Sequence, residues 1–265
     1  MKNILVPVGT SENAVSHLQY AVDFARAFGA NLFVVQVYNV YTKAGTIIKV
    51  DHIIERESLS FLKKHISKID TTGVEVTAKL FKGKLVDTIE KINKSLNIDL
   101  LLLEPKTNSV KEEVFLGNTS GRIVKQTKIP ILIVPEGLKY KPMPNILFAI
   151  KSAILKKEKS LDPLKEIQAK FNAKIHLLLV KTQYHKEGDF EVSDTLSNMV
   201  VSTTYSENPT TYLGVLEHIK QINPDLLVVV RRKRGFFTKL WEKNSILKKD
   251  LYITTIPILV LREMK

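Results

Sequence analysis

The stretch with the clearest chemical character runs from Pro105 to Pro135 and reads PKTNSVKEEVFLGNTSGRIVKQTKIPILIVP. Within it, Gly117, Asn118 and Thr119 open a segment with helical period, and that segment leads into an apolar strand. Free amides at a helix N-terminus bind phosphate, so this order of loop, helix and strand is typical of a phosphate seat in an α/β protein. The residues between Pro105 and Gly117 include no glycine, which leaves open whether the seat is functional or vestigial.

A second group of candidate functional residues is basic. The run RRKRG from Arg231 to Gly235 follows one apolar segment, and Lys151 follows another. Guanidinium forks suit phosphate and carboxylate groups, and the carboxyl ends of neighbouring parallel strands border one crevice. The sequence therefore predicts a candidate anion site, with a solvated basic turn as the alternative reading. Its five members are Lys151, Arg231, Arg232, Lys233 and Arg234.

Other chemistry finds little support. The chain has no cysteine, and its six histidines show no short metal-ligand spacing, so we read them as surface or helix-face residues. The segment Gly9-Thr10-Ser11 lacks the Gly-x-Ser-x-Gly signature of a hydrolase nucleophile, and it is better read as a helix cap. We predict no catalytic residue, no metal site and no enzymatic activity.

Short Val/Ile/Leu-rich runs alternate with amphipathic segments along the chain, a pattern typical of βαβ units around a parallel sheet buried on both faces. In the first half, we expect strands near residues 3–8, 31–38, 74–81, 100–103 and 131–134. We expect helices near residues 12–28, 50–67, 84–97 and 118–127. Right-handed crossovers then give a doubly wound sheet, with the loops at its carboxyl edge carrying the candidate residues.

The chain repeats itself. NILVPV at Asn3–Val8 recurs as NILFAI at Asn145–Ile150, and IPILIVPE at Ile129–Glu136 recurs as IPILVLRE at Ile256–Glu263. The offset falls from 142 residues (145 minus 3) to 127 residues (256 minus 129), so the second copy is shorter in its middle. We predict two domains, residues 1–138 and 145–265, and a short or irregular second helix in the second domain.

These blocks resemble the universal stress protein family in its tandem form. The resemblance rests on ILVPVGTSENA, FKGKLVDTIEKI and LGNTSGRIVKQTKIPILIVP. It implies two Rossmann-like, adenine nucleotide alpha hydrolase-like domains, each a five-stranded parallel sheet flanked by helices, with the second domain shortened. It also implies pairing through the last strand, so we expect PILIV and PILVL to lie side by side in an internal pseudo-dimer, which would cover two apolar edges.

The resemblance also implies a degenerate nucleotide motif. The family pattern of Gly, two residues, Gly, nine residues, Gly and Ser or Thr falls on Glu104, Thr107, Gly117 and Asn118, and its acidic residue falls on Gly9. Side chains at 104 and 107 fill space that glycine leaves empty, and a carboxylate repels phosphate. We therefore interpret the site as vestigial, although Lys106 and Lys111 would partly offset the negative charge of Glu104. Its members are Pro7, Val8, Gly9, Val37, Gly117, Asn118 and Thr119.

Composition limits the partners. The formal net charge is +13, which permits binding to polyanions, although no nucleic-acid motif accompanies it and nucleic acid is not expected. No apolar run reaches the length of a membrane span, and we expect a cytoplasmic protein.

The leading hypothesis is a non-enzymatic stress-response protein that acts through protein contacts, with a small ligand left open and no cofactor expected. The alternatives are an ATP or adenine-nucleotide binder using the first domain, and a polyanion binder using the basic loop of the second. The protein partner and a further homodimer are left open.

Overall fold

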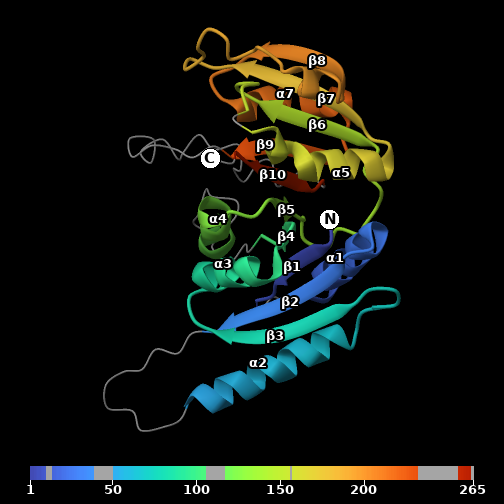
Figure 1. Cartoon of the computed structure of the whole chain (residues 1–265), viewed down its shortest axis with the longest axis vertical. Coiled ribbons are helices and arrows are strands. Elements are labelled where there is room, and N and C mark those ends of the chain that lie inside the picture. The colour runs from blue at the N-terminus through green and yellow to red at the C-terminus, as the bar shows by residue number, and fades with distance from the viewer. Residues whose placement is uncertain (10–13, 39–49, 106–116, 156, 232–255, 264–265) are drawn as a thin grey trace, which may run out of the picture.

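The computed structural model describes residues 1–9, 14–38, 50–105, 117–155, 157–231 and 256–263. Ten strands form one sheet in the order β3-β2-β1-β4-β5-β10-β9-β6-β7-β8 (Figure 1). The strands of the first half are β1 (Asn3–Pro7), β2 (Asn31–Tyr38), β3 (Val76–Lys82), β4 (Leu100–Leu103) and β5 (Ile131–Ile133). Its helices are α1 (Ala14–Phe28), α2 (Val50–Ile66), α3 (Leu85–Leu96) and α4 (Gly117–Gln126).

The second half repeats this arrangement. Its strands are β6 (Asn145–Ile150), β7 (Lys174–Lys181), β8 (Val200–Glu207), β9 (Leu226–Arg231) and β10 (Ile258–Arg262). Its described helices are a 3-10 turn (Glu158–Leu161), α5 (Asp162–Phe171), α6 (Asp194–Ser197) and α7 (Thr211–Ile222). Within each half all strand pairs are parallel. The predicted fold class is confirmed, and α6 has 4 residues where α2 has 17, as the shortened repeat predicts.

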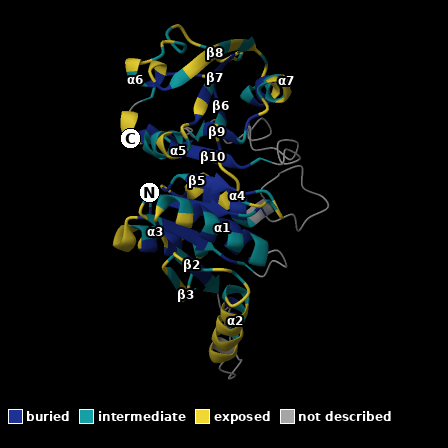
Figure 2. Ribbon diagram, turned by 90° about the vertical axis from the view of Figure 1, so that its right-hand side faces the viewer, coloured by how far each residue is buried: buried dark blue, intermediate teal, exposed yellow. Residues whose placement is uncertain are grey.

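Alternate strand residues build two cores, one on each face of the sheet. In β1, Ile4 and Val6 belong to one core and Leu5 to the other. The first core is covered by α1, α2, α5 and α6, and the second by α3, α4 and α7. Figure 2 shows the central strands as the most buried part of the molecule. Strands buried on both faces must be apolar throughout, which explains runs such as LLLL in β4.

The two halves join along their last strands. β5 pairs with β10 in antiparallel orientation, with Leu132 opposite Leu259 at the centre of the contact. The predicted adjacency of PILIV and PILVL is thereby confirmed. Away from the sheet, the rings of Phe28 in α1 and Phe171 in α5 lie 5.7 Å apart, and the N-terminal amine forms an ion pair with Glu166. The sheet therefore continues from one half into the other.

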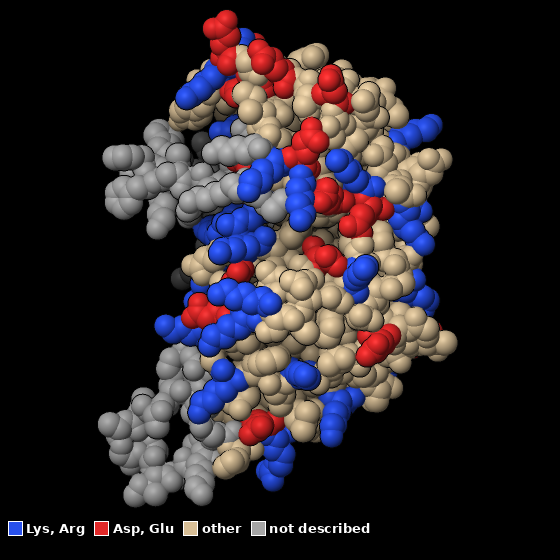
Figure 3. Space-filling model, in the orientation of Figure 1, with Lys and Arg blue, Asp and Glu red and all other residues tan. Residues whose placement is uncertain are grey.

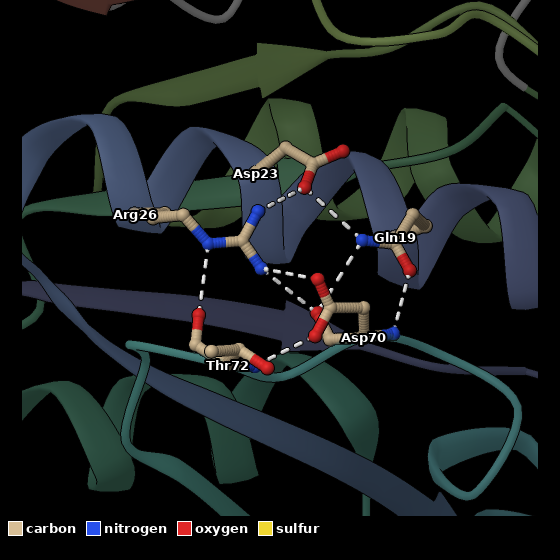
Figure 4. Close-up of polar contacts among 5 residues, drawn as sticks. All are labelled: Gln19, Asp23, Arg26, Asp70 and Thr72. Atoms are coloured by element: carbon tan, nitrogen blue, oxygen red, sulfur yellow. Dashed lines mark hydrogen bonds and ion pairs between the residues drawn. The ribbon is translucent and has the colours of Figure 1, made fainter.

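A polar network fixes the entry to the edge strand β3. The Arg26 side chain donates to the carbonyl oxygens of Asp70 at 3.0 Å and Thr72 at 2.9 Å, and to the Asp23 carboxylate at 2.6 Å (Figure 4). Gln19 accepts from the Asp70 amide at 2.9 Å. Because α1 packs on the sheet, this network ties the turn after α2 to the core. No helix among the described residues is long and apolar enough to cross a membrane.

Candidate functional site

The carboxyl ends of β1 and β4 form the switch point of the first half. The chain continues from β1 to β2 on one side, while β4 lies on the other side. β1 and β4 pair through Ile4 with Leu100 and through Leu5 with Leu101, ahead of the point where both strands end. In open α/β sheets, ligands bind in the crevice outside such a point. The predicted site residues Pro7, Val8 and Gly9 lie at this end of β1.

Neighbouring elements hold these residues in place. The amide of Val8 donates to the carbonyl oxygen of Val35 in β2 at 2.8 Å, and the Val8 side chain is buried. Val37 lies two residues further along β2, opposite Phe81 in β3, and is half-buried. The structure therefore places Pro7, Val8, Gly9 and Val37, four members of the predicted nucleotide site, along the carboxyl edge of the sheet.

The start of α4 reaches the same edge. The hydroxyl of Ser120, a buried residue in the first turn of α4, donates to the carbonyl oxygen of Glu104 at 3.0 Å. Glu104 directly follows β4, so this bond joins the beginning of the helix to the end of the strand. The backbone at Gly117, Asn118 and Thr119 is helical from its first residue, as the phosphate seat requires.

Glu104 itself occupies the position of a motif glycine. Its carboxylate oxygen Oε1 is buried, and the residue as a whole is half-buried. An ionised carboxylate here adds negative charge at the edge where phosphate would sit, and repulsion between like charges strengthens when water is excluded. Lys106, Thr107 and Lys111, which belong to the same predicted site as Glu104, lie outside the described residues.

A buried histidine at this switch point was not predicted. His17 lies on the inner face of α1, is 6% exposed, and hydrogen-bonds to the backbone of Leu102 in β4. Burial lowers the pKa of His17 to about 4, so its imidazole is neutral at pH 7. The sequence predicts a surface or helix-face position for His17; the residue lies on a helix face and is buried. The helical spacing of apolar residues could have indicated this burial, because His17 lies on the same face of α1 as the buried Ala14, Leu18 and Ala21.

Arg231, a member of the predicted anion site, contacts the first half of the chain. The guanidinium nitrogen Nη1 of Arg231 donates to the carbonyl oxygen of Val124, and lies 3.3 Å from that of Thr127. Arg262, its neighbour in β10, also donates to Thr127 O, at 2.6 Å. These carbonyls belong to the C-terminal end of α4, where unsatisfied oxygens attract cations. Arg262 was not predicted, because its partner is remote in sequence.

The rest of the predicted anion site remains a prediction. Lys151 is exposed directly after β6, at the carboxyl edge of the second half. Arg232, Lys233 and Arg234 lie outside the described residues. An anion at this edge would therefore depend on Lys151 and on residues that the structure does not describe, while Arg231 already contacts backbone carbonyls of α4.

Exposed cations of the first half gather over α3 and α4. Figure 3 shows a cluster of basic side chains on this part of the surface. The exposed lysines and arginines of these elements include Lys91 and Lys94 in α3, and Arg122, Lys125 and Lys128 in or just after α4. No group of three His, Asp or Glu side chains within the described ranges is placed to hold a metal ion.

Comparison with known proteins agrees with this architecture. Residues 1–135 match the sequence model described as "Universal stress protein family". A universal stress protein of Methanocaldococcus jannaschii is 21% identical over 138 residues, which cover 50% of this chain and 81% of that protein. The crystal structure of a universal stress protein from Archaeoglobus fulgidus has a TM-score of 0.74 at 18% identity, covering 99% of this chain and 98% of its own.

A second solved structure also spans both halves. The structure of a putative universal stress protein from Pseudomonas aeruginosa has a TM-score of 0.60 at 14% identity, covering 99% of this chain and 93% of its own. At these identities, the two solved structures support the fold over both halves of the chain.

Proposed function

Because residues 1–135 match its sequence model, this chain belongs to the universal stress protein family, and we propose that it is a non-enzymatic, cytoplasmic stress-response protein acting through protein contacts. Two adjoining features support a role without polyphosphate chemistry. The motif position after β4 carries Glu104 in place of glycine, and the acidic position after β1 carries Gly9. The single observation that carries the proposal is the buried Oε1 of Glu104 at the end of the crevice that would hold phosphate.

A second candidate is binding of an adenine nucleotide by the first half. The bond from Ser120 to Glu104 O favours it, because it keeps the first turn of α4 at the carboxyl end of β4. Val8 and Val37 would then flank the base and ribose, and the amides of Gly117, Asn118 and Thr119 would face one phosphate. This arrangement suits a single phosphate better than a triphosphate, because the Glu104 carboxylate next to the phosphate site would repel the additional phosphate charges.

The test is native mass spectrometry of the full chain purified without added nucleotide, followed by calorimetric titration with ATP and with AMP. We expect the mass of the unliganded chain and no heat of ATP binding at millimolar concentration. Tight ATP binding, or ATP hydrolysis above the buffer rate, would overturn the first proposal. AMP binding without ATP binding would support the second candidate, while binding of neither nucleotide would eliminate it.

Protein contacts need a separate measurement. The full chain, carrying an affinity tag, would be captured from its host before and after stress under crosslinking, with a charge-reversed α4 surface variant as control. The variant replaces Arg122, Lys125 and Lys128 by glutamate. We expect stress-dependent crosslinks to defined proteins; crosslinks that do not change with stress would contradict the proposed role.

A further inference from the structure

The two outer strands of the sheet differ in how they are protected. β3 and β8 end the strand order, and within the described residues β8 pairs only with β7. An edge strand presents unpaired amides and carbonyls that can recruit another strand, so proteins cover such edges or place charges on them. β3 carries exposed Lys79 and Lys82, and α2 lies beyond it at one end of the molecule (Figure 1).

Within the part of the chain that the structure describes, β8 has neither a covering helix nor a row of charges. Its sequence is VVSTTYSE, in which the only charge is the terminal Glu207, and that carboxylate pairs with Lys181 at 3.4 Å. The short α6 does not replace α2, and Figure 2 colours part of β8 as exposed. Val201 is 57% exposed and Tyr205 62%. Among the described strands, β8 alone has large hydrophobic side chains that are exposed.

We propose that β8 is the interface through which two copies of this chain associate, by antiparallel pairing of β8 with β8. The strand itself carries little charge. Each copy carries a formal charge of +13, so two copies repel one another wherever lysines and arginines face each other. Residues Val200–Ser206 carry no charge, and they form the edge where backbone hydrogen bonds are available.

The sequence of β8 is complementary to itself. The exposed residues of β8 are Val201, Ser202, Thr203, Tyr205 and Glu207, and four of them, Val201, Thr203, Tyr205 and Glu207, are spaced two residues apart. In an antiparallel pair centred on Thr203, Val201 of each copy faces Tyr205 of the other, and the two Thr203 side chains face each other. Aromatic with β-branched pairs and threonine pairs are among the stabilising cross-strand combinations. The same register keeps the two Glu207 carboxylates apart.

A bulge limits how far this pairing extends. The register with β7 passes from Ile175 opposite Val200 to His176 opposite Ser202, so Val201 is an extra residue in β8. Bulges twist an edge strand and restrict its pairing. The bulge ends the regular register at Val201, so pairing is confined to Val201–Tyr205, and it closes after two copies because the other edge carries Lys79 and Lys82. A peptide strand from another protein is the competing occupant.

The experiment is sedimentation equilibrium of the full chain over a concentration series, compared with two double variants. V201K/Y205K places lysine opposite lysine in the proposed register, and we expect the dimer dissociation constant to rise about 100-fold or more. V201K/Y205E places lysine opposite glutamate in the same register, and we expect it to dimerise, with an affinity that falls as salt rises. A78K, at an exposed position of β3, is the matched control and should dimerise like the parent.

Two further measurements distinguish loss of the dimer from a failure of a variant to fold. Thermal unfolding of each variant at low concentration reports folding, and hydrogen exchange reports whether β8 amides become protected as concentration rises. A monomeric parent at every concentration overturns the proposal, as does a dimer that A78K weakens as much as V201K/Y205K does. A dimer that survives V201K/Y205K also overturns it. None of these results depends on nucleotide binding.

Discussion

Arg231, the last residue of β9, donates a hydrogen bond to the carbonyl oxygen of Val124 in the last turn of α4. The bond crosses the join between the two halves, and Arg262 adds a second at Thr127. The same helix starts at the candidate phosphate seat of the first half. α4 is therefore held at its N-terminal end by the first half, through Ser120, and at its C-terminal end by arginines of the second.

We expect replacement of either arginine by alanine to lower the free energy of unfolding by about 1–2 kcal/mol, because hydrogen bonds from charged donors are stronger than neutral ones. R122A, on the exposed face of α4, should change stability by less than about 0.5 kcal/mol. Urea unfolding measures all three. The double variant R231A/R262A should lose less than the sum of the single losses, since both side chains share Thr127 O. Losses equal to that of R122A would contradict this role.

The second prediction concerns the degenerate motif. Replacing both Glu104 and Thr107 by glycine removes a carboxylate and the side chains that fill the phosphate site. ATP affinity should therefore increase if the rest of that site is intact. Calorimetric titration of E104G/T107G against the parent measures the change. E104Q is the matched control: it removes the charge but keeps the volume, so it should recover only part of the gain. Equal ATP binding by parent and double variant would show that these positions do not limit affinity.

Local pattern predicted most of the fold. Apolar runs of four to eight residues gave the strands, the repeat gave two five-stranded units, and the shorter middle of the second copy gave the short α6. These features depend on periodicity and on spacing within one copy. The pairing of β5 with β10 was predictable because each is an apolar last strand that needs a neighbour.

The site was less predictable. Arg231 looked like part of an anion crevice, yet its guanidinium contacts a residue 107 positions earlier, in the other half. His17 looked unremarkable among six histidines, and only the packing of α1 on β4 reveals its burial. Side-chain direction at a strand end depends on the neighbouring domain, which one sequence does not specify. Position at the edge of the sheet was predictable, whereas the partner of each side chain was not.

The third prediction tests the packing of α7 on β7. A Cβ atom on Gly214 would lie 2.7 Å from Cγ2 of Val180, a fully buried side chain. G214A therefore forces α7 away from the sheet, at a cost of about 1–3 kcal/mol for overpacking, which exceeds the roughly 1 kcal/mol that alanine adds to helix stability. The free energy of unfolding should fall in urea titrations. V180A in the same chain should restore part of the loss; a G214A variant as stable as the parent would show that the helix can shift freely.

The fourth prediction concerns acid stability and His17. Its folded-state pKa of about 4 lies below the ordinary value of 6.5, because burial disfavours the charged imidazole. The unfolded chain therefore binds the proton more readily, and the contribution of this residue to stability is complete above pH 6.5 and is lost as pH falls towards 4. The shift corresponds to about 3 kcal/mol. Carboxylates also titrate in this window, so the informative quantity is the difference between parent and H17L. Between pH 7 and pH 4.5, the free energy of unfolding measured in urea should fall less for H17L than for the parent. An equal fall in both proteins would refute the assignment.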